Sequence, residues 1–226
     1  MADGKIGTME NRAVFDHIAE SWDRVYHRTR FRKELEGLAE RWRSGRLLNV
    51  GCGHGPDFEP FKSGFELHGV DFSAGMLATA RRFAEKVGLK VNFVLADARR
   101  LPYRDGTFDW AVAVAIYHHI EGAAARLQAF EELRRVLKPG SEAFLTVWNR
   151  NQPRFEGRSP DIIVPFHVGV QSFPRYYHLY TFDEFREVLV EAGFTVLRLS
   201  PEASFSGHIP ERSRNICALV MPANNL

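Results

Sequence analysis

Apolar positions along this chain fall into short continuous runs and into stretches with helical spacing. The runs end near residues 50, 71, 97, 115 and 148, and stretches with helical spacing separate several of them. Short runs bounded by glycine or proline are typical of buried strands, whereas apolar residues three and four apart are typical of a helix face. Strands that alternate with helices form a mostly parallel sheet with helices on both faces. The pattern therefore predicts an α/β fold between residues 46 and 148.

The pattern on either side of this region predicts the rest of a single domain, residues 1–226. Helical spacing over residues 10–21 and 29–42 predicts two helices, which we expect to form a cap (1–45) over the core (46–148). The spacing lapses over residues 149–180, which predicts a long loop insertion, and a loop of that length is more often functional than idle. Residues 181–184 match a capping box that opens a helix, and two antiparallel strands near 195–199 and 215–221 complete the C-terminal part (181–226).

The run that ends at Val50 leads into three glycines spaced two apart, Gly51, Gly53 and Gly55, with Cys52 between the first two. A residue without a Cβ atom can adopt the backbone angles of a tight turn and lets a ligand lie against the main chain. A helix that follows such a turn directs its first N–H groups into the same crevice, at the carboxyl ends of the strands. The sequence therefore predicts a ligand site at this turn.

Two carboxylates follow at the ends of the next apolar runs. Asp71 lies twenty residues after Gly51, a distance that suits the two hydroxyls of a ribose, and Asp97 closes the third run. The G-x-G-x-x-G fingerprint of nicotinamide and flavin enzymes does not fit, because Pro56 occupies the place of its third glycine. A glycine-rich turn with solvated carboxylates at strand ends is the simpler alternative.

Taken in order, the glycine turn, Asp71 after the second strand and Asp97 after the third resemble the S-adenosylmethionine site of the class I methyltransferases (methyltransferase type 11 domain). The resemblance implies a Rossmann-like α/β fold with a seven-stranded, mostly parallel sheet of order 3-2-1-4-5-7-6, and S-adenosyl-L-methionine as the cofactor. Core or capping roles stay open for Phe72, Met76 and His119. The cofactor-binding positions that the resemblance implies are Arg30, Gly51, Cys52, Gly53, Gly55, Asp71, Phe72, Ser73, Met76, Asp97, Ala98, Ala115 and His119.

Further segments resemble one family more narrowly, the tRNA wobble-uridine methyltransferases that esterify 5-carboxymethyluridine. This resemblance implies tRNA as the substrate and a small zinc-binding activator protein as a candidate partner. The sequence departs from the usual pattern at Asn49, where methyltransferases usually carry an acid, and at Ser141, which replaces the second glycine of a Pro-Gly-Gly turn. The segments that carry the resemblance are Thr29-Arg30-Phe31, Leu101-Pro102-Tyr103, Ile116-Tyr117-His118-His119, Val147-Trp148 with Gln152, Asp161 with Val164-Pro165-Phe166, and Arg175-Tyr176-Tyr177-His178-Leu179-Tyr180.

Residue types between positions 149 and 180 fit methyl transfer to a carboxylate. Such an acceptor, with a pKa near ~4, is already ionised at neutral pH, so the reaction needs positioning rather than a general base. Arginine offers a planar fork for a carboxylate, and Arg175 is the first candidate for this clamp and Arg30 the second. We predict that Tyr176 and His178 orient or stack the base and that Asp161 holds an arginine or a ribose hydroxyl. These four residues of the segment, Arg175 included, are the predicted catalytic residues, and packing or solvated roles are the alternative for each.

Composition and charge narrow the functional classes. Hydrophobic residues make up 45% and charged residues 26% of the 226 residues, which is enough for a full core, while the net charge of +2 decides nothing alone. Residues 24–46 hold eight Lys or Arg against three acids. With Arg150, Arg154 and Arg158 they are candidates to contact phosphates, although an ordinary solvated helix fits residues 24–46 equally well.

The two cysteines and the N-terminal segment bear on metal binding and location. Cys52 and Cys217 cannot form a C-x-x-C pair, so we expect no metal site and a reducing, cytoplasmic location. No apolar run approaches the ~20 residues of a membrane span, and residues 1–9 lack the apolar region of a secretory signal. We therefore expect no membrane partner.

Two rival functions stay open at this stage. A methyltransferase of a small molecule, such as a quinone, a phenol or a carboxylic acid, would share the cofactor half and use residues 149–180 as a closed pocket. A non-catalytic protein that binds the cofactor or RNA would keep the fold and transfer nothing, and Asn49 is a hint in that direction. Methyl incorporation into bulk tRNA, compared with incorporation into small-molecule extracts, separates these functions.

Overall fold

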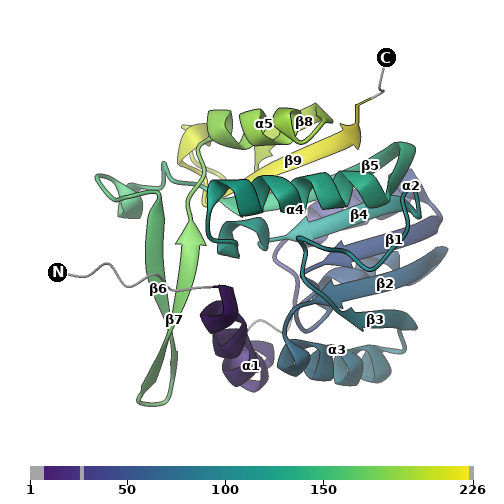
Figure 1. Ribbon diagram of the computed structural model, residues 1–226, viewed down its shortest axis with the longest axis horizontal. Coiled ribbons are helices and arrows are strands. Elements are labelled where there is room, and N and C mark those ends of the chain that lie inside the picture. Colours follow the sequence, from purple (N-terminus) through teal and green to yellow (C-terminus); the bar gives the residue numbers. More distant parts are fainter. Residues whose placement is uncertain (1–7, 26–27, 224–226) are drawn as a thin grey trace.

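The computed structural model describes residues 8–25 and 28–223. A seven-stranded sheet lies at the centre of the fold (Figure 1). The strand order is β3-β2-β1-β4-β5-β9-β8. Strands β1 to β5 run parallel, whereas β9 pairs antiparallel with both β5 and β8. The predicted order 3-2-1-4-5-7-6 is confirmed, because two further strands, β6 and β7, lie outside this sheet. The seven strands are β1 (Gly45–Val50), β2 (Phe65–Asp71), β3 (Val91–Leu95), β4 (Phe108–Val114), β5 (Leu137–Trp148), β8 (Phe194–Pro201) and β9 (Asn215–Pro222).

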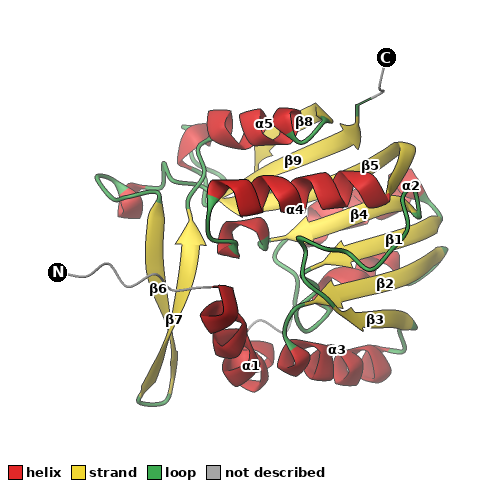
Figure 2. Cartoon of the chain, viewed as in Figure 1, coloured by secondary structure: helices red, strands yellow, loops and turns green. Residues whose placement is uncertain are grey.

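Helices cover both faces of the sheet (Figure 2). They are α1 (Thr8–Val25), α2 (Arg32–Trp42), α3 (Ala74–Val87), α4 (Ala123–Val136) and α5 (Phe182–Glu191), with 3₁₀ turns η1 (Pro56–Phe61), η2 (Tyr117–His119), η3 (Pro153–Phe155) and η4 (Pro210–Arg212). Successive strand residues point to opposite faces of the sheet, so each central strand contributes side chains to a hydrophobic core on either face. Strand residues that pack with α4 and α5 include Leu48, Ala111, Leu145 and Ala218. Strand residues that pack with α2, η1 and α3 include Leu47, Val112, Phe144 and Leu219.

Two helices begin at residues whose side chains cap them, and the second of these caps lies at the capping box predicted from the sequence. The Ser73 side chain accepts a hydrogen bond from the Met76 N–H at the start of α3, and the Thr181 side chain accepts one from the Glu184 N–H at the start of α5. Each cap satisfies a backbone donor that has no partner within the helix. The first of these caps sets the direction of α3 directly beside the end of β2.

The segment from residue 149 to residue 180 differs from the predicted loop. Its second half is an antiparallel hairpin of β6 (Asp161–Val168) and β7 (Gln171–His178), which lies beside α1 and away from the main sheet (Figure 1). Pro165 faces Pro174 across the hairpin, and proline cannot donate to a strand ladder. The two facing prolines therefore interrupt the strand signal of the sequence, although Ile162, Ile163 and Val164 are β-branched residues typical of a strand.

The predicted two-helix cap also needs correction. Helix α2 packs in the core on one sheet face, where the Trp42 ring stacks on Trp110 at 5.0 Å between centroids. Only α1 lies over the carboxyl ends of the strands, and Asp16 fastens it there. Asp16 Oδ1 accepts hydrogen bonds from Ser73 Oγ at 2.6 Å and from the Gly75 N–H at 2.9 Å. The cap is thus one helix held to the start of α3. Across residues 8–25 and 28–223, no helix combines the length and apolar character needed to cross a membrane.

Candidate active site

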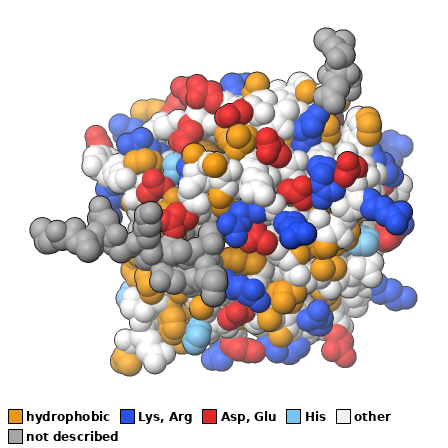
Figure 3. Space-filling view, in the orientation of Figure 1, with side chains coloured by type: hydrophobic (Ala, Val, Ile, Leu, Met, Phe, Trp, Pro, Cys, Tyr) orange, Lys and Arg blue, Asp and Glu red, His pale blue; other side chains and the backbone are white. Residues whose placement is uncertain are grey.

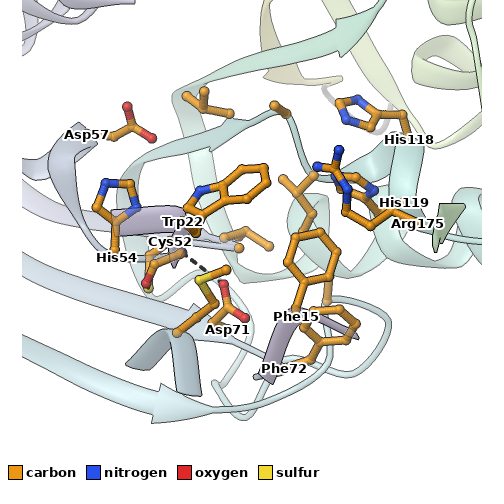
Figure 4. Close-up of a pocket in the computed structure, with 18 of the residues that line it drawn as sticks. Phe15, Trp22, Cys52, His54, Asp57, Asp71, Phe72, His118, His119 and Arg175 are labelled. Atoms are coloured by element: carbon orange, nitrogen blue, oxygen red, sulfur yellow. Dashed lines mark hydrogen bonds between the residues drawn. The ribbon is translucent and has the colours of Figure 1, made fainter. Parts of the chain in front are cut away.

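A cavity of about 420 Å³ opens at the carboxyl ends of β1, β2 and β4 (Figure 4). Helix α1, the hairpin and the residues after β5 complete its walls. Twelve of the seventeen residues predicted for the site line it: Arg30, Gly51, Cys52, Gly53, Asp71, Phe72, Met76, Asp97, Ala98, Ala115, His119 and Arg175. The other five, Gly55, Ser73, Asp161, Tyr176 and His178, do not.

The glycine turn forms the floor of the cavity. Gly51 has a φ of +66° and Gly53 a φ of +53°, a region that favours glycine. A Cβ atom on Gly51 would lie 2.8 Å from the Ile116 side chain, whereas a Cβ atom on Gly53 would meet nothing within 4 Å. The open space beside Gly53 is therefore room for a ligand against the main chain.

Asp71 is held at this floor by backbone donors. Its Oδ2 accepts from the Gly53 N–H at 2.8 Å and its Oδ1 from the Ser73 N–H at 2.9 Å. Burial raises the pKa of Asp71 to about 6, although these N–H groups act in the opposite direction. A carboxylate fixed in this way can accept from both hydroxyls of a ribose. Ser73 thus supports the predicted ribose acceptor without lining the cavity itself.

Asp97 and the surrounding apolar side chains form the adjoining wall. Arg99 pairs with Asp97, with Nη2 at 2.6 Å from Oδ2. Burial raises the pKa of Asp97, but the hydrogen bonds from Arg99 outweigh it and leave that pKa below its usual value. Phe72 contacts Phe15 of α1 at 5.7 Å between ring centroids, so α1 covers this wall. The wall has the flat, apolar surfaces that a purine needs.

The end of β4 contributes a strained residue and two neutral histidines. Ala115 has a φ of +58°, which is rare for a residue with a side chain and is found where a site imposes it. His119 donates from Nδ1 to the Tyr176 carbonyl at 3.0 Å, and burial lowers the pKa of His119 to about 3. Burial also lowers the pKa of His118, whose Nδ1 accepts from the Trp148 N–H. Neither imidazole carries a charge at neutral pH.

Arg175 of β7 reaches the same end of the cavity and is only 5% exposed. Its guanidinium carbon lies 5.2 Å from the Trp22 ring, 5.3 Å from Phe166 and 5.2 Å from Tyr177, all measured to ring centroids. The Nε atom is buried without a hydrogen-bond partner, and no carboxylate forms an ion pair with Arg175 within the described residues. The structure thus holds a desolvated cation in an aromatic cage.

Asp161, Tyr176 and His178 form a separate group behind β7. Asp161 accepts hydrogen bonds from the Tyr176 hydroxyl and from His178 Nδ1, the latter at 2.9 Å. His178 Nε2 lies 2.6 Å from Glu184 Oε1, which ties the hairpin to α5. Burial raises the pKa of Asp161, but these hydrogen bonds leave it below its usual value. The three residues therefore brace the strand that carries Arg175.

Several cavity residues were missed in the sequence. Phe15 and Trp22 come from α1, Asp57 follows the glycine turn, and Arg214 precedes β9. The antiparallel pairing of Asn215 with Trp148 brings Arg214 to the end of β5. The predicted antiparallel final strand could therefore have indicated that Arg214 lies near the site. Nothing local in the sequence marks the two aromatic residues of α1.

Cofactor binding is consistent with this donor set. The turn offers open space at Gly53, Asp71 offers a ribose acceptor, and apolar walls flank the position next to Asp97. Within the residues that the structure describes, no group of three His, Cys, Asp or Glu could hold a metal ion. The open space at Gly53, the carboxylate of Asp71 and the apolar walls suit an organic cofactor with a sugar and a ring.

Comparison with known proteins agrees with this geometry. The family model described as a methyltransferase domain matches residues 48–145. A putative methyltransferase of Encephalitozoon cuniculi is 33% identical over 163 residues, which cover 69% of this chain and 72% of that protein. The tRNA (carboxymethyluridine(34)-5-O)-methyltransferase of Arabidopsis thaliana is 34% identical over 142 residues, 62% of this chain and 32% of that protein. The chain thus spans only about a third of the length of that larger relative.

A solved structure supports the same assignment. An S-adenosylmethionine-dependent methyltransferase of Clostridium acetobutylicum superposes with a TM-score of 0.72 at 15% identity, over 93% of this chain and 99% of that one. At that identity the likeness shows the fold, and the relatives and the family model show the family. The chain therefore belongs to the class I S-adenosylmethionine-dependent methyltransferases, with S-adenosyl-L-methionine as its cofactor.

Proposed function

We propose that this enzyme methylates a carboxylate on a modified wobble uridine of tRNA and so forms the methyl ester. The observation that carries the proposal is Arg175, which is buried, caged by three aromatic rings and without a carboxylate partner in the part of the chain described. A buried charge without compensation is costly. An anionic acceptor would supply the missing charge, and a planar carboxylate matches the guanidinium fork.

The chain's own contribution is to hold the acceptor and keep water out. When bound, S-adenosyl-L-methionine supplies a methyl group activated by its sulfonium charge. A carboxylate acceptor is ionised at neutral pH, so no residue has to remove a proton. His118 and His119 are neutral, so the positive charge at this end of the cavity comes from arginine, and Arg175 is the arginine buried among aromatic rings. Alignment of acceptor and donor by Arg175 then supplies the rate.

We assign Asp161, Tyr176 and His178 a positioning role rather than a contact with the base. They lie outside the cavity wall and bind one another and Glu184. Arg126 Nη1 lies 3.4 Å from the Tyr176 hydroxyl, which ties the group to α4 as well. Together these contacts fix β7, and with it the direction of Arg175.

Arginines at the cavity mouth support a polyanionic substrate. Arg154 stacks over the Trp148 ring at 4.7 Å and over the Phe155 ring at 4.4 Å, and Arg214 lies 5.6 Å from Trp148. A second hollow on the far side of Phe155 is lined by Arg150, Arg158 and Arg212 among others. Over the face viewed in Figure 3, basic and acidic side chains are interspersed, so the arginines around Phe155 are the stronger candidates for phosphate contacts.

A protein partner is a further part of this proposal. The resemblance to the wobble-uridine enzymes implies a small zinc-binding activator. A protein described as a putative methyltransferase, solved in complex with the Haloferax volcanii Trm112 methyltransferase activator, has the same fold, with a TM-score of 0.69 at 18% identity over 96% of this chain and 98% of that one. We propose that such an activator binds this chain, and co-purification with a small zinc-binding protein is the test.

The substrate proposal is tested with tRNA that carries 5-carboxymethyluridine, labelled S-adenosyl-L-methionine and nucleoside mass spectrometry. We expect a methyl ester that alkali hydrolyses. Arg175→Met should lower kcat/KM by about 100-fold, or about 2.7 kcal/mol, while cofactor affinity stays unchanged. Arg198→Met, at an exposed position of β8, is the matched control and should behave as wild type.

Salt dependence tests the phosphate contacts. Each phosphate contact should add roughly 0.7 to 0.9 to the slope of log affinity against log salt, and Arg154→Ala should reduce that slope. Transfer to a quinone, a phenol or a small carboxylic acid, with none to tRNA, would refute the RNA proposal in favour of a small-molecule methyltransferase.

A further inference from the structure

The cavity contains a second carboxylate, Asp57, whose role is not explained by the ribose or the acceptor. Asp57 follows Gly55 and Pro56 at the start of η1 and lines the cavity. Burial raises the pKa of Asp57 to about 6, and the hydrogen bond with the Thr29 side chain is the opposing influence. No Lys, Arg or His of the described segments forms an ion pair with it. A desolvated carboxylate of this kind is stabilised when a cation binds beside it.

Its place in the cavity identifies which part of the ligand it meets. Figure 4 shows Asp57 and Phe72 on opposite sides of the cavity, with Asp71 between them. If the ring lies at Phe72 and the sugar at Asp71, the rest of the cofactor runs across the glycine turn toward Asp57. That remaining part is the methionine moiety, which carries an α-ammonium and an α-carboxylate.

The position that usually supplies an acid in methyltransferases does not serve this end. Asn49 stands there, is fully buried in β1 and does not line the cavity. Neither its Nδ2 nor its Oδ1 has a hydrogen-bond partner. Asn49 therefore supplies no negative charge to the α-ammonium, whereas Asp57, the first carboxylate after the glycine turn along the chain, lines the cavity.

We propose that Asp57 binds the α-ammonium group of the cofactor, while Arg30 binds the α-carboxylate. Thr29 hydrogen-bonds Asp57, so its neighbour Arg30, which also lines the cavity, lies at the same end. An anion and a cation at the same end of the cavity match a zwitterion. The pair selects a cofactor or product that retains its amino-acid group and discriminates against adenosine thioethers that have lost it.

Calorimetry with three probes tests this assignment independently of any substrate. The probes are S-adenosylhomocysteine, its des-amino analogue that keeps the carboxylate, and 5′-methylthioadenosine, which lacks both groups. Wild type should bind S-adenosylhomocysteine at least 10-fold more tightly than the des-amino analogue. Asp57→Asn should weaken S-adenosylhomocysteine by 10- to 100-fold and leave the des-amino analogue unchanged. Asp71→Asn, the matched control, should weaken all three probes because each contains the ribose.

Thr29→Val provides a milder test, since it removes the hydroxyl that hydrogen-bonds Asp57 and that also accepts from the Phe31 N–H. It should lower affinity for S-adenosylhomocysteine several-fold more than affinity for the des-amino analogue. Equal affinity of wild type for these two probes would overturn the proposal even if neither variant folds. Equal weakening of both probes by Asp57→Asn would overturn it as well. Failure of the tRNA proposal would leave every one of these measurements unchanged.

Discussion

The two glycines of the turn allow the packing role and the ligand role of the motif to be separated. Gly51 and Gly53 both have positive φ, so alanine at either position incurs roughly 1–2 kcal/mol of backbone strain. Only at Gly51 would the new Cβ overlap a neighbour, with the Ile116 Cβ and Cδ1 atoms 2.8 Å away. Overpacking of that kind adds about 1–3 kcal/mol. We therefore expect Gly51→Ala to lower the free energy of unfolding by about 2–5 kcal/mol and Gly53→Ala by about 1–2 kcal/mol.

Cofactor affinity should show the reverse order. The Gly53 position faces open space in the cavity, so a methyl group there takes room that the cofactor needs. Urea denaturation of the ligand-free protein measures the first effect, and calorimetric titration with S-adenosylhomocysteine measures the second. Equal destabilisation by the two substitutions, or wild-type affinity in Gly53→Ala, would refute this reasoning.

Three further outcomes are expected. Asp16→Ala removes the acceptor for Ser73 Oγ and the Gly75 N–H, and should lower the unfolding free energy by about 2 kcal/mol and increase hydrogen exchange in α1; unchanged exchange would contradict the fastening role. Burial raises the pKa of Asp71 to about 6, so between about pH 4 and pH 6 the folded state binds a proton at Asp71 that the unfolded chain does not bind. As the pH falls from 7 to 5, protonation of Asp71 should therefore raise the free energy of unfolding by about 1 kcal/mol. Over the same range the affinity for S-adenosylhomocysteine should fall, because the ribose loses an ionised acceptor. Asp71→Asn should abolish both trends, and a rise of stability and affinity together would contradict this reasoning. His178→Ala should lower kcat on tRNA several-fold with unchanged cofactor affinity, and an unaltered kcat would exclude its positioning role.

The hairpin shows why part of the site was predicted in the wrong place. The sequence resemblance marked residues 175–180 as one block, and a loop gives no reason to divide them. In a strand, successive side chains point to opposite sides. Arg175 and Tyr177 consequently line the cavity, whereas Tyr176 and His178 point toward Asp161 and Glu184. Strand parity, invisible in a segment read as a loop, separates contact residues from bracing residues.

Features that depend on neighbours along the chain could be predicted from the order of the amino acids. Short apolar runs predict the central strands, and the glycines at 51 and 53 predict the turn. The position of Asp71 beside this turn is also predictable, because the carboxyl ends of parallel strands lie at the same edge of the sheet. Which distant side chains share the cavity depends instead on how the segments pack against one another. Arg175 and Asp57 come from segments more than a hundred residues apart, and the docking of α1 and the hairpin is what desolvates the cavity. Burial is a property of packing between segments, and no local pattern encodes it.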